Sequence, residues 1–380
     1  MVSWNDAEQW NADGVAAVGD ALVKARNAIV ALEDELTESV SPKEWSGPSA
    51  ESARRDLAKH RQDLETLAAE VASMATTVDT VEDAVRGLRR EIDEAKSLAS
   101  SHGLRIDNGT VVAPEGVTTL PAELARSAVA ERVKAILDKA AAVDTDLAAM
   151  LDRVLANKIS DAGATTLAEA AAAGEERVRL DQILKNYQVS PDPDGTVNFF
   201  GQTVTKSEAD LLDDLGLLGI KDMYDIRNKA FGTADDRFPG QDGNDSHRDA
   251  FRHAYWNALM TQKFGEEWAQ KYGTAHERLP GNPADREAMD LYNNEVGRKI
   301  AAANPDASPE ELANLVEKAV EDGRTVVIDK NGELAYSNDV AGGQTGHADD
   351  PAPEKEGGER GSSHTSGGSG DGSGDYDWGS

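Results

Sequence analysis

Acidic and histidine side chains recur one helical turn apart between residues 246 and 300. Asp249 and His253 are four residues apart, so on a helix both would lie on one face, and Asp290 with Asn294 repeats the spacing. Neutral imidazoles and carboxylates are ligands that suit zinc, manganese and iron. The sequence therefore predicts a divalent transition metal, zinc or manganese, and indicates no organic cofactor. The predicted metal ligands are Asp249, His253, His276 and Asp290.

Further polar residues supply the groups that a hydrolase needs beside a metal. A bound metal would lower the pKa of a water into the range of a nucleophile, and Glu277 or Asp249 would take the proton. Arg252 or Arg298 would hold an anionic group of the substrate. The predicted catalytic residues are Glu277, Arg252, Arg298 and Asn294.

The order of these histidines and acids resembles the H…HD…D arrangement of helical metal-dependent phosphohydrolases, with Glu277 in the place of the Asp that follows the second His. The resemblance implies metal-assisted hydrolysis. The alternative interpretation is structural. His253 would be a satisfied core histidine, the two arginines would bridge acids, and the polar cluster would only hold three helices together.

Three predicted helices carry these residues. Ser246 with Asp249 three residues on is a capping-box pattern, which predicts a helix over residues 247–263. A second helix follows and ends at the turn sequence LPGNP of residues 279–283, and a third begins directly after it. Helices joined by such short loops must pack together, so their polar faces could meet.

Heptad patterns dominate the first half of the chain. Apolar residues step by three and four over residues 15–36, 57–92 and 129–154, which predicts three long helices, and Gly47-Pro48 predicts a reversal between the first two. Asn-Gly pairs further along predict small β-hairpins. The predicted fold class is mainly α: a long N-terminal helical hairpin or coiled-coil region, a compact C-terminal helical domain with small β-hairpins, and a disordered tail.

Changes in composition divide the chain into segments. Two prolines and a glycine after Ser190 mark a boundary. The final stretch, rich in Gly, Ser and acids, cannot bury enough apolar surface to order itself. The predicted segments are a helical hairpin at residues 1–102, a helical extension at 103–189, a C-terminal domain at 190–340 and a disordered tail at 341–380.

Charge and residue content exclude several classes of protein. The chain has 39 Lys and Arg residues against 70 Asp and Glu residues, a formal net charge of −31, which argues against a long nucleic acid as partner. The absence of cysteine removes disulfides and thiolate sites. The acidic start lacks the features of a Sec signal peptide, and no window of about 18 residues is free of charge, so no membrane span is predicted. Residues 240–303 are nearly neutral, so an anionic substrate is not excluded there.

Trp45-Ser46-Gly47 stands between the two helices of the predicted hairpin. This arrangement resembles the WXG-type helical hairpins exported by type VII secretion systems, over residues 1–102. The resemblance implies a secreted (non-Sec) or cell-surface protein, and a WXG-type or secretion-system partner for the N-terminal helices. The sequence lacks the Tyr-x-x-x-Asp/Glu signal common among such proteins, so either a co-exported partner would supply it or the hairpin has another use. The alternative is a coiled-coil spacer.

A second pattern lies in residues 242–300. It reads R-H-x-x-W, then H-E, then M-D-x-x-N-N-x-x-G-R, and it is similar to an uncharacterised bacterial family attached to secreted toxins. The resemblance implies a toxin-associated domain, with an immunity protein as a partner, and no particular activity. The position of Tyr292 is often histidine in that family, so no catalytic role is carried over to it.

These observations predict a secreted toxin-like effector exported by a type VII system, whose C-terminal helical domain is a metal-dependent hydrolase of a phosphoester or lipid-type substrate. Two alternatives stay open. One is a non-enzymatic secreted scaffold or interaction protein whose heptad helices bind a partner. The other is a nuclease toxin.

Overall fold

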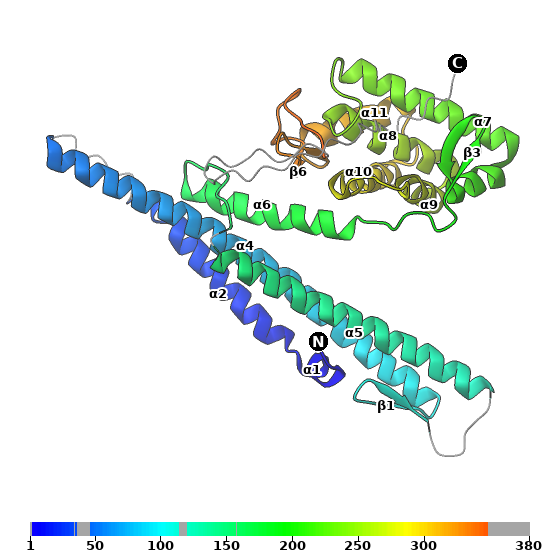
Figure 1. Cartoon of the computed structure of the whole chain (residues 1–380), viewed down its shortest axis with the longest axis horizontal. Helices are drawn as coiled ribbons and strands as arrows, with labels where there is room; N and C mark the ends of the chain where they lie inside the picture. Colours follow the sequence, from blue (N-terminus) through cyan, green and yellow to red (C-terminus); the bar gives the residue numbers. More distant parts are fainter. Residues whose placement is uncertain (1, 34, 36–45, 114–119, 157, 349–380) are drawn as a thin grey trace, which may run out of the picture. The chain divides into compact units, whose positions relative to one another are not determined.

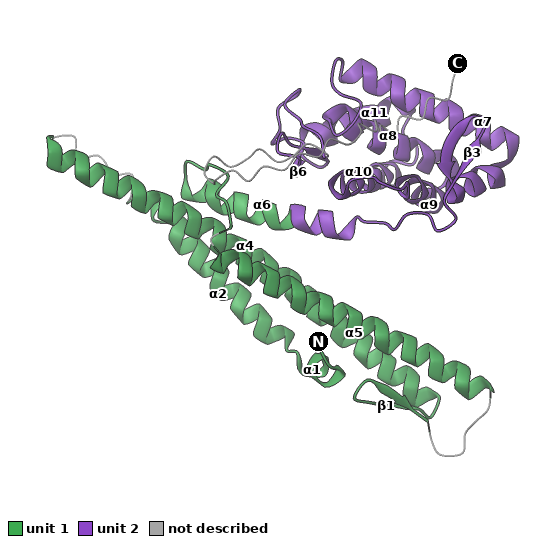
Figure 2. Cartoon of the chain, viewed as in Figure 1, with its two compact units in different colours: residues 1–179 green, residues 180–380 purple. Residues whose placement is uncertain are grey.

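The computed structural model describes residues 2–33, 35, 46–113, 120–156 and 158–348 (Figure 1). Two compact units make up the chain, unit 1 at residues 1–179 and unit 2 at residues 180–380 (Figure 2). The described residues are mainly helical, with three two-stranded antiparallel sheets, which confirms the predicted fold class. In these ranges no helix is both long enough and apolar enough to cross a membrane.

Unit 1 consists of long helices packed side by side. Helix α4 lies along both α2 and α5, as the heptad patterns predict (Figure 1). Its buried face carries alanines in the middle and larger aliphatic residues such as Leu88 and Ile92 further on. The elements of unit 1 are α1 (Trp4–Gln9), α2 (Ala12–Val30), α4 (Pro48–Ser101), β1 (Arg105–Asp107), β2 (Thr110–Val112), α5 (Leu120–Leu155) and the first part of α6 (Leu167–Asn186).

Local signals explain where several of these elements begin and end. Helix α4 begins at Pro48, in the first turn, where the missing proline N–H is not needed. The β1–β2 turn places Asn108 and Gly109 at positive φ, as the Asn-Gly pair predicts. Helix α2 ends at Val30, short of the predicted residue 36. Residue 36, Trp45 of the WXG motif and residues 349–380 of the predicted tail lie outside the described residues.

Unit 2 is built around helix α8, which contacts four other helices: α7, α9, α10 and α11. Because neighbours cover it on every side, every residue of α8 from Asp249 to Met260 is buried, polar ones included. The elements of unit 2 are the end of α6, β3 (Thr196–Phe199), β4 (Gln202–Thr205), α7 (Lys206–Arg237), α8 (His247–Phe264), α9 (Glu266–Glu277), α10 (Ala284–Ala303), α11 (Pro309–Glu321), β5 (Val326–Ile328) and β6 (Leu334–Tyr336).

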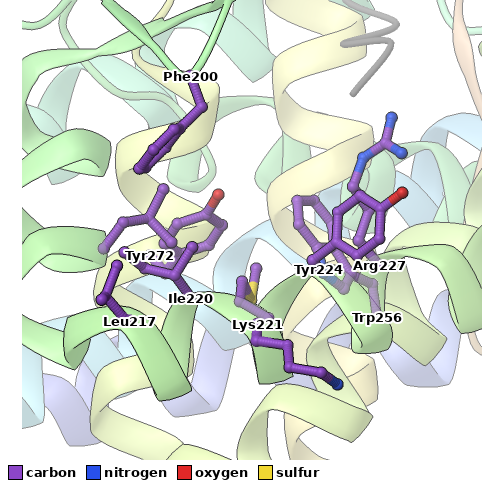
Figure 3. Close-up of a pocket in the computed structure, with 10 residues that line it drawn as sticks. Phe200, Leu217, Ile220, Lys221, Tyr224, Arg227, Trp256 and Tyr272 are labelled. Atoms are coloured by element: carbon purple, nitrogen blue, oxygen red, sulfur yellow. The ribbon is translucent and has the colours of Figure 1, made fainter. Parts of the chain in front are cut away.

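Helix α7 is interrupted at Gly216, whose φ of 64° and ψ of 177° are not helical. The chain after this break, together with the tip of the β3–β4 hairpin, borders an apolar pocket whose inner wall includes Trp256 of α8 and Tyr272 of α9 (Figure 3). The break in α7 therefore lies beside a cavity, and α7 does not present one continuous helical surface here.

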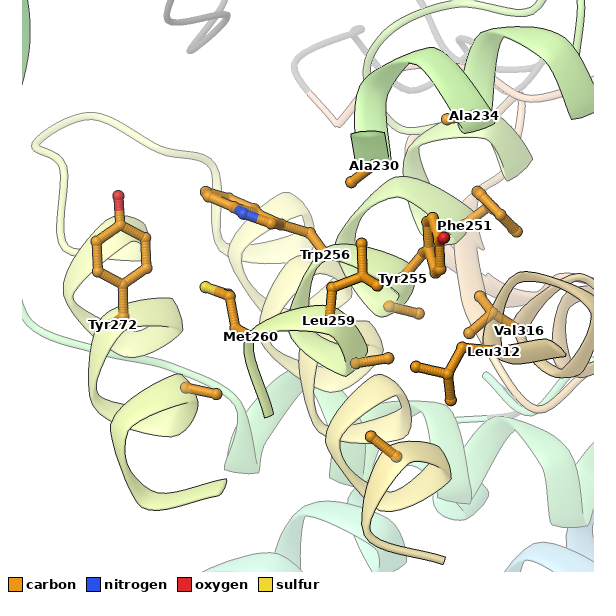
Figure 4. Close-up of a cluster of buried hydrophobic side chains, with 14 of the residues drawn as sticks. Ala230, Ala234, Phe251, Tyr255, Trp256, Leu259, Met260, Tyr272, Leu312 and Val316 are labelled. Carbon is orange, nitrogen blue, oxygen red and sulfur yellow. The ribbon is translucent and has the colours of Figure 1, made fainter. Parts of the chain in front are cut away.

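The largest apolar cluster of unit 2 joins α8 to α7 and α11 and also includes residues of α9 and α10. Phe251 and Tyr255 project from α8 toward Ala230 of α7 and toward Leu312 of α11, and all four side chains are almost fully buried (Figure 4). Alanines on α7 let it approach the aromatic side chains closely. This core fixes the rotation of α8 and therefore the direction of its polar residues.

Candidate metal centre

The first turn of α8 is held by buried polar groups. The Ser246 hydroxyl accepts the Asp249 amide at 3.4 Å, so the helix begins at His247 as the capping pattern predicts. The Asp249 carboxylate uses Oδ2 to accept the backbone N–H of Asp245 at 2.7 Å, and its Oδ1 accepts Nε of Arg252 at 3.1 Å. Both carboxylate oxygens are therefore fixed in direction.

Three predicted ligands meet in the interior of unit 2. His253 Nε2 lies 3.5 Å from Asp249 Oδ1 and 3.5 Å from Asp290 Oδ1. These three residues, here called the Asp–His–Asp group, are all buried, and their ligand atoms lie within 4.8 Å of one another, so the group could hold a metal ion. Two members come from α8 and one from α10, which are two of the three helices whose polar faces were predicted to meet.

A chain of hydrogen bonds determines which nitrogen of His253 carries the proton. Arg298 can only donate, and its Nη1 lies 3.2 Å from the Asn257 side-chain oxygen. The Asn257 nitrogen must then donate to Asn294 Oδ1, at 2.5 Å. Because Asn294 Oδ1 is an acceptor, His253 Nδ1, 3.2 Å away, must carry the hydrogen. His253 Nε2 is therefore left with a lone pair facing the two aspartates.

In this arrangement three atoms that carry lone pairs face one another: His253 Nε2, Asp249 Oδ1 and Asp290 Oδ1. With Nε2 unprotonated, neither aspartate oxygen receives a hydrogen bond from His253, and within the described residues Asp290 Oδ1 has no hydrogen-bond partner. Buried acceptors that face each other repel unless a proton or a cation lies between them. The donor set of one imidazole and two carboxylates fits a divalent metal ion.

Burial shifts the pKa values of His253 and Asp290 in the directions that favour the neutral form of each side chain. Burial, with Arg252 next, lowers the pKa of His253 well below its ordinary value. Burial and the nearby Glu277 and Asp249 carboxylates raise the pKa of Asp290 well above its ordinary value. In the absence of a cation, the cluster therefore keeps a proton that an ordinary aspartate would lose.

Glu277, the predicted base, lies on the other side of the His253 ring. Its Oε1 is 3.8 Å from His253 Nδ1, is buried, and has no hydrogen-bond partner among the described residues. Burial raises the pKa of Glu277 to about 7; the neighbouring His276 ring reduces this effect and the Asp249 carboxylate increases it. Glu277 can therefore exchange a proton near neutral pH.

His276 lies beside this group but pairs with a different acid. Its Nδ1 is 2.9 Å from Glu208 Oε1, and its ring centroid is 6.4 Å from that of His253. Burial disfavours the charged ring, but the Glu208 carboxylate outweighs burial and raises the pKa of His276. The Asp–His–Asp group thus forms without His276, whose assignment as a ligand stays a prediction.

The two arginines and Asn294 contact protein groups in the cluster. Arg252 pairs with Asp249, and Arg298 with Asn257, so both guanidinium groups lie inside rather than on the surface. Asn293, by contrast, exchanges two hydrogen bonds with the backbone of Val326 and fixes β5 against α10. Binding of a substrate anion by either arginine stays a prediction.

Sequence reasoning missed two acids that belong to this site. Glu208 caps α7 in a reciprocal capping box with Thr205, a T-x-x-E pattern that the sequence displays. Asp245, fully buried at a positive φ of 64°, accepts Arg286 Nε at 2.9 Å. No local pattern indicated that Asp245 would be buried, because its partner lies 41 residues away.

Comparison with known proteins finds one family model similar to the segment that carries this site. The family described as "Domain of unknown function (DUF6973)" matches residues 216–324, which include α8, α9 and α10. No curated protein and no solved structure matches the chain. By its fold and site, the molecule is a mainly helical protein with a buried Asp–His–Asp group that could hold a metal ion.

Proposed function

We propose that unit 2 is a metal-dependent hydrolase of a phosphoester or lipid-type substrate. The observation that carries this proposal is the buried Asp–His–Asp group, in which His253 Nε2 and one carboxylate oxygen each of Asp249 and Asp290 lie within 4.8 Å of one another. Carboxylates with one neutral imidazole suit zinc or manganese. A metal bound there would lower the pKa of a water and polarise a phosphoryl or carbonyl oxygen.

The neighbouring side chains have separate tasks in this proposal. Glu277 takes and returns a proton near neutral pH, since its pKa is about 7. Arg252 compensates part of the negative charge by holding Asp249. Asn294, fixed by Asn257 and Arg298, keeps the hydrogen on His253 Nδ1 and the lone pair on Nε2.

Hydrolysis by the full-length chain tests this proposal. The protein is stripped of metal, reloaded with zinc or manganese, and assayed with bis(4-nitrophenyl) phosphate and with phospholipid vesicles. We expect metal-dependent cleavage of one substrate that falls about 100-fold or more in Asp290→Asn. Glu287→Gln, which changes another mostly buried carboxylate of α10 outside the group, is the matched control. A metal-loaded, folded protein that cleaves neither substrate would contradict the hydrolase.

Burial favours one second candidate, a metal that only holds helices together. Each member of the Asp–His–Asp group is at most 5% exposed, which suits a structural site as well as a catalytic one. A structural metal would slow hydrogen exchange in α8 and α10 without supporting hydrolysis. The same metal-loaded samples distinguish the two functions.

For the whole chain we propose a secreted toxin-like effector exported by a type VII system. The packing of α2 along α4, with Gly47 and Pro48 at the start of α4, supports a hairpin that a WXG-type or secretion-system partner recognises. A toxin of this kind would need an immunity protein in the producing cell. Deletion of residues 1–102 should abolish export, and normal export of the truncated chain would contradict the proposal.

A further inference from the structure

Unit 2 contains a second candidate site, an apolar pocket of about 350 Å³. Phe200 at the tip of the β3–β4 hairpin and Leu217 and Tyr224 of α7 border it, and Trp256 of α8 forms part of its wall (Figure 3). A volume of this order is typical of sites that enclose a small molecule. The pocket is therefore large enough for a ligand and not merely a packing defect.

Exposed apolar side chains gather at this pocket. Phe200 is 70% exposed, Leu217 81%, Leu218 82% and Tyr224 41%. They are the large hydrophobic side chains that unit 2 leaves exposed within its described residues, and all but Leu218 line the pocket. Apolar side chains clustered around a concave site mark a surface that buries them against something else.

Two backbone features place these side chains at the mouth. Phe200 has a φ of 49° in the β3–β4 turn, a conformation that favours Asn or Gly and is strained for a bulky residue. Gly216 breaks α7 directly before the two exposed leucines. A strained aromatic that is also exposed contributes little to folding, so its position indicates a role in binding.

The charge at the mouth indicates the polarity of the ligand. Among the described residues that line the pocket, the charged ones are Lys221 and Arg227, and none is acidic, in a chain with a net charge of −31. Lys221 pairs with Asp225, and both side chains are more than half exposed, so this ion pair is weak and a ligand can replace it. Arg227 lies 4.1 Å from the Phe231 ring. An anionic group is the complement of this rim.

We propose that the pocket binds a free, single-chain anionic amphiphile, with its alkyl chain in the cavity and its acid group at one of the two cationic side chains of the lining, Lys221 or Arg227, which point in different directions (Figure 3). The site is separate from the metal centre and does not depend on hydrolysis there. Trp256 connects the two regions, because it lines the pocket and its ring lies 5.3 Å from that of His276. A bound chain should therefore change the fluorescence of Trp256.

Displacement of 11-(dansylamino)undecanoate from the full-length chain by laurate tests the proposal. We expect laurate to compete, and dodecyltrimethylammonium, with the same chain length and opposite charge, to compete at least about tenfold more weakly. Equal competition by the cation would overturn the assignment of the rim. If the chain associates with anionic phospholipid vesicles but laurate does not displace the dansyl probe, the proposed ligand site is wrong and the exposed apolar side chains bind a membrane surface instead.

Variants at the mouth separate a binding role from a structural one. Leu217→Gln should weaken laurate binding roughly tenfold, whereas Leu155→Gln, at an equally exposed leucine of unit 1, should leave it unchanged. Phe200→Asn should weaken binding while raising the Tm of unit 2, because asparagine tolerates the positive φ. A lower Tm with unchanged binding would show that Phe200 serves the fold, and would contradict the proposal.

Discussion

Units 1 and 2 are both helical, but they bury different kinds of side chain. Within the described residues, unit 1 buries three polar side chains and unit 2 buries eighteen. In unit 1 the buried Ser73 and Thr77 donate to backbone carbonyls of Gly174 and Ser73, and the third residue, Glu65, pairs with the partly exposed Arg61. In unit 2 charged side chains surround the central helix. Keeping charge inside a protein is costly, which supports the proposal that unit 2 contains the functional site.

The largest difference between the two units should be the loss of stability when one ion pair is broken in each. Arg252→Met leaves the buried Asp249 carboxylate without its cation and should destabilise unit 2 by about 3–5 kcal/mol. The matched variant in unit 1, Arg86→Met, removes a solvent-exposed guanidinium paired with Glu82 and should leave stability nearly unchanged. Hydrogen exchange of α8 and α4 amides reads each unit separately. Equal effects in both units would remove the contrast drawn between them.

The pH dependence of stability should follow Glu277. Its pKa is raised from 4.5 to about 7 in the fold, so between these values the folded state binds the extra proton and stability falls as pH rises. Glu277→Gln should remove about 3 kcal/mol of this loss between pH 4.5 and 8. His253 acts oppositely, since its lowered pKa reduces stability as pH falls below about 6.5.

Urea unfolding of wild type and Glu277→Gln across this pH range measures the contribution of Glu277 together with its effect on the neighbouring Asp290, whereas the His253 contribution is common to both. Zinc or manganese should restore the stability of the wild type at pH 8 and not at pH 5, where protons compete for the ligands. Parallel curves for the two proteins would contradict the assignment.

Two glycines allow close helix packing, one in each unit. A Cβ at Gly297 would lie 1.9 Å from the Ala254 carbonyl oxygen, and one at Gly174 would lie 2.2 Å from the Ala69 carbonyl oxygen. Alanine at either position should cost roughly 1–3 kcal/mol or more. Only Gly297→Ala should also weaken metal binding, because it moves α10 and Asn294 away from α8. Weakened metal binding in Gly174→Ala would show that the effect is not local.

The smallest effect should come from the hydrogen-bond chain behind His253. Arg298→Met frees Asn257 to turn over, so His253 can change tautomer, and metal affinity should fall about tenfold. Lys299→Met, at an exposed neighbour, is the control. Nitrogen NMR of labelled histidine should show Nδ1 protonated in the wild type. A protonated Nε2 in the metal-free wild type would refute the chain of donors.

The sequence predicts unit 1 better than it predicts unit 2 as a whole. Heptad spacing is local, so it indicates α4 and α5 directly, and the Asn-Gly pair indicates the β1–β2 turn. Helix α7 follows no single period because Gly216 interrupts it, and Phe200 occupies a turn position whose positive φ favours Asn or Gly. These exceptions to local preference border the apolar pocket.

Part of the candidate site could be predicted from spacing along the chain. Asp249 and His253 share a face of α8, and Asp290 shares a face of α10 with Asn294. The spacing of four residues predicts both pairs, because it corresponds to about one turn of a helix. The partner of His276 could not be predicted, because Glu208 comes from α7, 68 residues earlier. Periodicity does not determine which helices meet.

Metal content of the purified full-length chain tests the central claim most directly. Mass spectrometry after incubation with zinc or manganese should find about one ion per folded chain in the wild type and in His247→Ala, a variant of another buried histidine of α8. Folded His253→Ala and Asp290→Asn should bind none. A folded wild type that binds no metal, or a His253→Ala that binds as much as the wild type, would contradict the Asp–His–Asp group as a metal centre.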